Sequence, residues 1–369
     1  MEKQTTMHAS INRNNRNRQK TLALLFCFSL WAGSGQAQQQ TERQAPWCSY
    51  AALETRMDFN MQLTDRSKDR FSSAFQGKFL NFQMDGYLVP SVSYHYRQRI
   101  NAGNMGFSTT FFEGTDWMFL EWNFTKRLSV SAGKEVVAIG GWEYDLAPIN
   151  MYYWSEFWNN VNCYEMGASL HYRTERSHLQ LQVTNSPYIT KNMANLYAYN
   201  LIWYGDFGWF KPIWSTNLIE CEKGKFIHYL ALGNKFDFGK SYLYIDFMNR
   251  ANDRQDHFFF QDYTVIVEAK REVTERLNFF AKGGWDWHER NEYKAEGYVI
   301  GVTPPDPYDW DLYVPAGTDY RYAGLGGEYY PLIGKNTIRL HAFALMKMYN
   351  EQLSFQTNLG LTWKLGIKN

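Results

Sequence analysis

The amino-acid sequence predicts an all-β protein, a single transmembrane antiparallel β-barrel of about sixteen strands. Three observations predict it. Apolar and polar residues alternate with a period of two in one segment after another, and the connections between these segments alternate between short and long. Aromatic residues make up 18% of the chain, although its mean hydropathy is only −0.50. A barrel with an apolar outer belt and a polar interior accounts for a high aromatic content together with a low mean hydropathy.

The N-terminal segment is expected to be a signal peptide. Basic residues precede the apolar run 22–31, and small residues Gly35 and Ala37 occupy positions −3 and −1 of a cleavage site. The run is too short to span a bilayer as a helix. A buried core helix directly after four cations is the weaker alternative. We therefore assign residues 1–37 to the signal peptide and residues 38–369 to the barrel.

Removal of the signal peptide leaves a nearly neutral chain. Without five bases and one acid of that segment, the protein keeps 33 of its 38 Lys and Arg and 36 of its 37 Asp and Glu, a net charge of −3. Such a balance gives no indication of a nucleic-acid partner. Cys48, Cys163 and Cys221 remain, without CxxC spacing, which favours isolated thiols over a metal site. The sequence does not decide whether Cys163 and Cys221 form a disulfide.

Period-two alternation defines the individual strands. In the last one, Phe355, Leu359 and Trp363 share a face opposite Gln356 and Lys364. In the first, the apolar set that includes Met57 and Phe59 alternates with Glu54, Arg56 and Asp58, which we therefore place on the lumen side. The same pattern recurs in 90–100, 162–173, 177–186, 262–271 and 336–347. Segments 73–84 and 226–236 carry apolar residues on both faces, so their registers stay open.

The connections show an asymmetry between the two ends of the predicted barrel. Short connections are expected near 85–88, 125–127, 174–176, 208–212, 237–239, 272–275 and 331–335. Longer ones are expected near 63–72, 100–113, 139–161, 187–197, 250–260 and 287–319, with two short exceptions near 222–225 and 348–352. Short periplasmic turns and long external loops produce this order when both termini are periplasmic. A Greek-key sandwich gives no reason for it.

Several segments are similar to a known family. Residues 132–135 (AGKE), 140–145 (GGWEYD) with Pro148, 85–99 and 181–187 resemble the porins of Bacteroidetes-type bacteria, which are related to the phosphate-selective porin O and P family. The resemblance implies a sixteen-stranded barrel in the outer membrane of a Gram-negative bacterium, in contact with membrane lipid and lipopolysaccharide. It also implies a homotrimer and a third long loop that folds inward and narrows the pore.

The predicted third loop, 139–161, departs from the family pattern. It contains no Lys or Arg, and its charges are Glu143, Asp145 and Glu156. Phosphate selectivity, which the family builds from inward arginines and constriction lysines, is therefore not carried over. Aromatic rings such as Trp142 beside these carboxylates would suit sugar stacking. A loop core that anchors the loop to the wall is an equal alternative.

A pair of arginines forms the other candidate feature of the lumen. Arg97 and Arg99 share a face with Ser93 and His95, about 7 Å apart along the strand. They predict a short anion track. The alternative is that they pair with lumen acids, for which the sequence offers Glu54, Asp58, Glu121 and Glu165. The complete pore-lining set expected from the sequence is Arg56, Asp58, Arg97, Arg99, Trp142, Glu143, Asp145 and Glu156.

The function predicted from these observations is passive diffusion of small polar or ionic solutes, with anion preference left open. An outer-membrane barrel hydrolase and a secreted polysaccharide-binding module are the competing classes. The sequence does not favour an enzyme, because His171, His178, His228, His288 and His341 are scattered and no Ser motif accompanies them. No cofactor or metal is expected. The acidic segment 304–311 is interpreted as solvated loop charge and not as a calcium site.

Overall fold

The computed structural model describes residues 46–64, 71–100, 114–187, 195–252, 255–289, 314, 317–332 and 337–368. These residues belong to one compact unit, Pro46–Asn369. The predicted signal peptide, most of the connections 100–113 and 287–319, and the acidic segment 304–311 lie outside the described residues.

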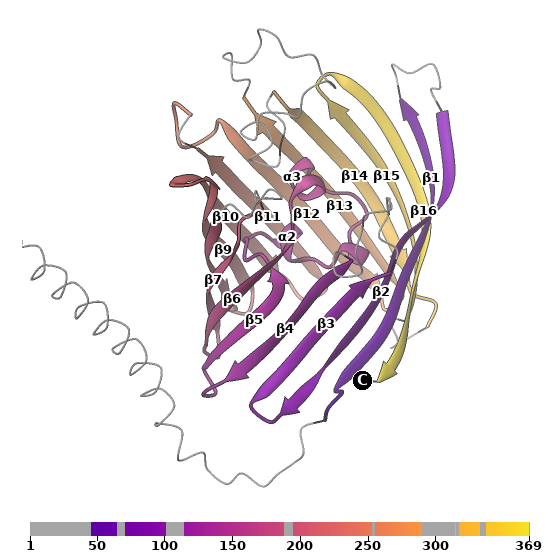
Figure 1. Cartoon of the computed structure of the whole chain (residues 1–369). Helices are drawn as coiled ribbons and strands as arrows, with labels where there is room; N and C mark the ends of the chain where they lie inside the picture. Colours follow the sequence, from indigo (N-terminus) through magenta and orange to yellow (C-terminus); the bar gives the residue numbers. More distant parts are fainter. Residues whose placement is uncertain are drawn as a thin grey trace, which may run out of the picture. The chain divides into compact units, whose positions relative to one another are not determined.

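Sixteen antiparallel strands form a closed barrel in which β1 pairs with both β2 and β16 (Figure 1). The predicted fold class is confirmed. The strands are β1 (Tyr50–Thr64), β2 (Phe71–Val89), β3 (Val92–Arg99), β4 (Thr115–Asn123), β5 (Leu128–Val136), β6 (Tyr164–Arg173), β7 (Ser177–Asn185), β8 (Tyr197–Gly205), β9 (Phe210–Glu222), β10 (Lys225–Asp237), β11 (Ser241–Ala251), β12 (Asp262–Thr274), β13 (Leu277–His288), β14 (Asp319–Tyr329), β15 (Ile338–Tyr349) and β16 (Gln352–Lys368).

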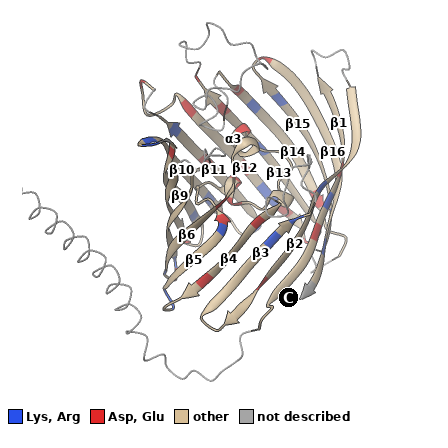
Figure 2. Cartoon of the chain, viewed as in Figure 1, with Lys and Arg blue, Asp and Glu red and all other residues tan. Residues whose placement is uncertain are grey.

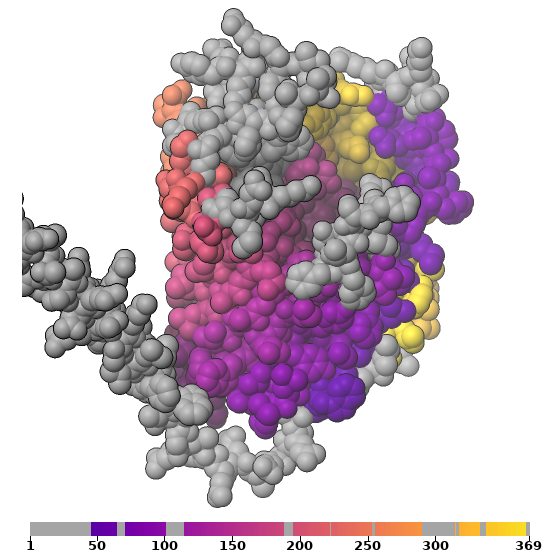
Figure 3. All heavy atoms as spheres, viewed as in Figure 1, coloured from indigo at the N-terminus to yellow at the C-terminus, as the bar shows by residue number. Residues whose placement is uncertain are grey.

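The alternation read from the sequence separates the two faces of this wall. In β15, Arg339, His341 and Phe343 are buried, whereas Leu340 lies on the exposed face. On the outside, Leu325 is 66% exposed, as a lipid-facing side chain of a membrane barrel is expected to be. The space-filling view shows the wall from the purple strands β2 and β3 to the pink strands β6 and β7 as a continuous surface (Figure 3).

The two ends of the barrel differ in the length of their connections. We call the end with the short turns, where β1 begins and β16 ends, the turn end, and the opposite one the loop end. Two residues join β2 to β3, and three join β6 to β7. On the loop end, β9–β10 and β15–β16 are joined by two residues each, the short exceptions that the sequence predicted.

One predicted turn, 85–88, was wrong. β2 continues through these residues to Val89, and Gly86 pairs with Tyr94 of β3. A Cβ at Gly86 would collide with the backbone oxygen of Trp47. Gly86 therefore allows the backbones of β2 and of Trp47 to approach closely. The turn between β2 and β3 is formed by Pro90 and Ser91.

The third long connection, 137–163, folds into the lumen (Figure 1) and is here called loop 3. It contains α2 (Trp142–Asp145), a 3-10 turn η1 (Pro148–Asn150) and α3 (Glu156–Asn160). Apolar loop residues such as Phe157 pack with inward residues of the wall such as Ile227 and Tyr229. The molecule therefore has its apolar core between this loop and the inner wall. Within the described part of the chain, no helix has the length and apolarity needed to cross a bilayer.

Candidate functional site

Two buried carboxylates of the wall hold the two helices of loop 3. Asp246 of β11 accepts the backbone N–H of Trp142 at 2.9 Å and of Glu143 at 2.8 Å. Asp286 of β13 accepts the N–H of Glu156 at 2.9 Å. A carboxylate at the first turn of a helix satisfies N–H groups that have no partner within the helix. Period-two alternation turns both aspartates inward, and their contacts fix where the loop lies.

Glu143 lies at the centre of a buried network and not beside open space. Its side chain is 3% exposed and forms a 2.6 Å ion pair with Nζ of Lys282. Oε1 of Glu143 also accepts the backbone N–H of Ser155 at 3.1 Å. Lys282 in turn donates to the carbonyl of Tyr153 at 3.0 Å. This network ties the loop to β13, so Glu143 anchors the loop although the sequence placed it among the pore-lining residues.

The other predicted residues of loop 3 divide between anchoring and lining. Trp142 donates from Nε1 to the carbonyl of Lys211 at 3.0 Å, and the Lys235 ammonium lies 4.6 Å from its ring. Asp145 is exposed within the barrel and lines a cavity of about 320 Å³ between the loop and strands β3–β8. Partial loss of water around its carboxylate raises the pKa of Asp145, and the charge of Lys235 opposes that rise.

Arg56 and Asp58 form a buried pair on β1 that holds the tip of loop 3. The guanidinium donates to both carboxylate oxygens, at 2.9 and 2.7 Å, and also to the carbonyl of Met151. His341 lies 3.1 Å from the same carboxylate. The Arg56 guanidinium lies 4.8 Å from the ring of Tyr152. Both residues face inward as predicted, yet each is engaged with protein groups.

Arg97 and Arg99 share one carboxylate, that of Asp116 on β4. Nε of Arg97 lies 3.2 Å from Oδ2, and Nη2 of Arg99 lies 2.8 Å from Oδ1. The four acids proposed from the sequence do not include this partner. Glu54 pairs with Lys364 at 3.1 Å, and Glu121 pairs with Arg173 at 2.5 Å.

A β-bulge explains why the sequence pattern missed Asp116. Strict alternation with Trp117 and Glu121 would turn Asp116 toward lipid. The register with β3 shifts between Arg97 and Gln98, which pair with Trp117 and Thr115 and leave Asp116 as the extra residue. The extra residue allows Asp116 to face the lumen at 3% exposure. The two arginines and Asp116 together carry a net charge of +1. Their role in anion transport stays a prediction.

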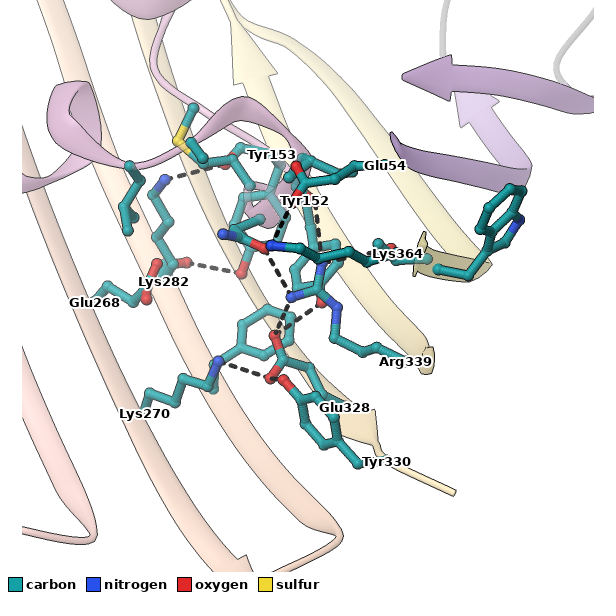
Figure 4. A pocket seen from close by; sticks show the side chains of 18 of the residues that line it. Glu54, Tyr152, Tyr153, Glu268, Lys270, Lys282, Glu328, Tyr330, Arg339 and Lys364 are labelled. Atoms are coloured by element: carbon teal, nitrogen blue, oxygen red, sulfur yellow. Dashed lines mark hydrogen bonds and ion pairs between the residues drawn. The ribbon is translucent and has the colours of Figure 1, made fainter. Parts of the chain in front are cut away.

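Loop 3 separates two cavities of different chemistry. The turn-end chamber has a volume of about 610 Å³ and the loop-end chamber about 510 Å³. Tyr152 and Tyr153 of the loop line both. Figure 4 shows the turn-end chamber, where charged side chains of the wall converge below the loop. Its charged lining residues are Glu54, Arg97, Glu268, Lys270, Lys282, Glu328, Arg339 and Lys364.

Glu328 contacts several of the other side chains that line the turn-end chamber. It accepts the hydroxyl of Tyr152 at 2.8 Å and pairs with Lys270 at 2.7 Å (Figure 4). Arg339 lies 3.8 Å from the same carboxylate and donates to the carbonyl of Ile149 at 3.0 Å. Acidic and basic positions are thus interspersed along the strands (Figure 2), and much of the lumen charge is internally compensated.

Two histidines that look scattered in the sequence are neighbours in the structure. His171 and His178 approach to 3.1 Å between ring nitrogens, and Ser131 Oγ lies 2.8 Å from the other nitrogen of His171. Ser131 is 1% exposed, so the contact is a polar link between wall strands β5, β6 and β7. The cysteines Cys48, Cys163 and Cys221 are free thiols. Among the residues described, no group of three or more His, Cys, Asp or Glu is placed to hold a metal ion.

Comparison with known proteins identifies this architecture. The family model "Phosphate-selective porin O and P" matches residues 51–204. A comparison with curated proteins gives no match. The solved outer membrane channel DcaP of Acinetobacter baumannii is similar at 10% identity and a TM-score of 0.58, covering 85% of this chain and 96% of that one.

A second solved structure gives the same result. The loop L8 deletion mutant of OmpT, an outer membrane protein of Vibrio cholerae, is similar at 10% identity and a TM-score of 0.56, covering 85% of this chain and 99% of that one. A trimer form of OmpT has 9% identity and a TM-score of 0.55. At these identities the likeness concerns the fold. The porin resemblance is therefore confirmed, whereas a Bacteroidetes origin stays a prediction.

Proposed function

We propose that the chain is a channel of the Gram-negative outer membrane that lets small polar or ionic solutes diffuse passively, and the match of residues 51–204 to the phosphate-selective porin O and P family supports this. The observation that carries this proposal is the polar lumen, in which loop 3 divides two chambers of about 610 and 510 Å³. Family and fold suggest a channel without enzymatic activity. A few charges at such a constriction govern what passes, because the surrounding low-dielectric wall focuses their field.

The proposed selectivity is a weak preference for anions. Five of the eight charged residues lining the turn-end chamber are basic, and Arg97 and Arg99 share a single carboxylate. The preference is weak because several of these cations are paired, Lys270 with Glu328 and Lys364 with Glu54. Asp145 of loop 3 adds an opposing negative charge. These charges, and not the name of the family, are the basis of the proposal.

We further propose a homotrimer with its apolar exterior in contact with membrane lipid and lipopolysaccharide. The similar OmpT structure exists in a trimer form. Large exposed apolar side chains, Leu325 and Leu359 among them, cover the outside of this barrel. Native mass spectrometry of the detergent-extracted protein measures the oligomeric state, and a monomer alone would contradict the trimer.

Planar-bilayer recording tests the channel directly. The folded protein should give stepwise conductance, and a salt gradient should give a reversal potential on the anion-selective side. The preparation is first shown to be folded by the difference in gel mobility between boiled and unboiled samples. Folded protein that never gives conductance steps would overturn the proposed function.

A further inference from the structure

We propose that the loop-end chamber is a binding subsite for a short neutral oligosaccharide. The inference rests on the proposed channel function and names a solute class for it. Six of the lining residues are amides: Asn60, Gln62, Gln76, Asn159, Gln352 and Gln356. Amides both donate and accept hydrogen bonds without carrying charge, which is the chemistry that sugar hydroxyls require.

The loop-end chamber differs from the charged chamber on the other side of loop 3. Its charged lining residues are two acids and two bases, Asp58, Glu156, Lys78 and Lys347, so their formal charges cancel. Asp58 also pairs with the buried Arg56, and with that base included the formal charges around the chamber sum to +1. Binding of a neutral solute does not depend on so small a net charge, and an ion is attracted by it only weakly.

The amides of β1, β2 and β16 are already arranged by one another. Asn60 donates to Gln76 at 3.0 Å, and Gln356 donates to Asn60 at 3.1 Å. Asn60 stands opposite Ala74 and Asn358, and Gln76 and Gln356 each lie two residues further along those strands, on the same face of the sheet. Asn358 also donates to the Asn60 oxygen, at 2.6 Å, so Asn60 keeps one N–H to donate, whereas Gln76 and Gln356 use only part of their donors and acceptors in these contacts. The remaining capacity is available to hydroxyl groups in the chamber.

Loop 3 supplies an aromatic ring to the same chamber. Trp154 is half-buried, and its indole N–H donates to Asn159 at 3.2 Å. Trp158 packs against it with ring centroids 5.0 Å apart, which fixes its orientation. Nζ of Lys78 lies 5.7 Å from the centroid of the Trp154 ring, so a sugar that packs its apolar face on this ring takes the place of that ammonium. The volume of about 510 Å³ lies within the range of about 300–1,000 Å³ that small-molecule sites have.

Sugar-induced block of the ion current tests the subsite. Maltotriose and cellotriose are added to the loop side of single channels, and the interruption of the current is measured against concentration. Block should be reached at lower concentration from the loop side than from the turn side. Trp154→Ala should weaken the block about tenfold, as loss of one aromatic contact implies, and Trp154→Phe should restore most of it.

Matched variants of the turn-end chamber provide the controls. Gln83→Ala and Trp117→Ala alter an amide and a ring that line the turn-end chamber and not the loop-end chamber, so they should leave the block unchanged. Each block is normalised to the open current of the same variant. Channels that conduct but are blocked by neither trisaccharide would overturn the subsite and leave the channel function intact.

A second measurement separates failure of the subsite from failure of the channel. If the folded protein does not conduct, tryptophan fluorescence of the detergent-solubilised barrel is titrated with the same trisaccharides. Saturable quenching that Trp154→Ala abolishes would support the subsite, and an unchanged signal would overturn it. Quenching by inorganic phosphate in place of the sugars would also overturn the proposed ligand class.

Discussion

At the residue scale, lumen charges have to be judged by their partners and not by their number. Arg97 and Arg99, for which the sequence predicted an anion track, both pair with Asp116, which neutralises one of the two charges. Glu143 and Asp145 are two residues apart, but the first is buried against Lys282 and the second is exposed. Only residues that retain an uncompensated charge beside the lumen are expected to change ion selectivity.

Removal of these charges should move selectivity in opposite directions. The double substitution Arg97→Ala with Arg99→Ala should lower the ratio of anion to cation permeability. Asp116→Asn should raise it, because two guanidinium charges then lack a counter-charge. Reversal potentials in a salt gradient measure both. Identical reversal potentials for the wild-type protein and the double variant would assign the arginines to the wall alone.

The raised pKa of Asp145 predicts a pH-dependent selectivity. As the pH falls from neutral, this carboxylate takes up a proton earlier than an ordinary aspartate does. The lumen loses a negative charge, so anion permeability should increase relative to cation permeability. Asp145→Asn should abolish that part of the pH dependence, and a pH profile unaffected by the substitution would contradict the assignment.

At the scale of elements, loop 3 is positioned by contacts with strands far from it in the sequence. Glu143 pairs with Lys282, and Asp246 and Asp286 hold the first turns of the short helices. Helices of four and five residues have little stability of their own in water. Their geometry is therefore imposed by the wall, and a change in the wall should be transmitted to the constriction.

Substitution of Lys282 should loosen loop 3. Lys282→Ala leaves the Glu143 carboxylate buried without its cation, a change that costs about 3–5 kcal/mol in comparable buried pairs. The expected results are a lower free energy of unfolding and noisier open-channel current. Lys364→Ala is the matched control: its pair with Glu54 is more exposed and is worth about 0–1 kcal/mol. Equal effects of both substitutions would contradict the anchoring role.

At the scale of the whole molecule, closure of the barrel depends on one long pairing between the first and last strands. β1 and β16 pair in register from Ala52 with Gly366 to Thr64 with Ser354. An unclosed barrel would expose two edge strands, whose unpaired backbone groups cannot be satisfied by lipid. The strands closest to the two termini are therefore as important for stability as those in the middle of the chain.

Deletion of residues 352–368 tests this closure. The truncated chain should fail to insert as a folded barrel, and its mobility on a gel should be the same with and without boiling. A deletion of a few residues within the connection 101–113 between β3 and β4 serves as the control for chain shortening, since it removes no residue of a strand. Heat-modifiable mobility of the truncated chain would contradict the prediction.

The sequence by itself determined most of the strands, the order of short and long connections, and the inward and outward faces of the strands that alternate cleanly, whereas the registers of 73–84 and 226–236 stayed undetermined. Those features depend on local alternation between lipid and water, which a period of two records directly. Arg56 and Asp58 were placed correctly on the lumen side for the same reason. The turn predicted at 85–88 was wrong because Gly86 lies inside β2, where it allows a close approach of the Trp47 backbone that the local sequence does not reveal.

Only the tertiary structure decided which charges meet and where the lumen is divided. Asp116 reaches Arg97 and Arg99 through a bulge, and Lys282 reaches Glu143 across about 140 residues of chain, neither of which a local period can express. The chemistry of the two chambers likewise depends on strands from both termini meeting beside loop 3. Alternation fixes which way a side chain points, whereas closure of the barrel fixes what it faces.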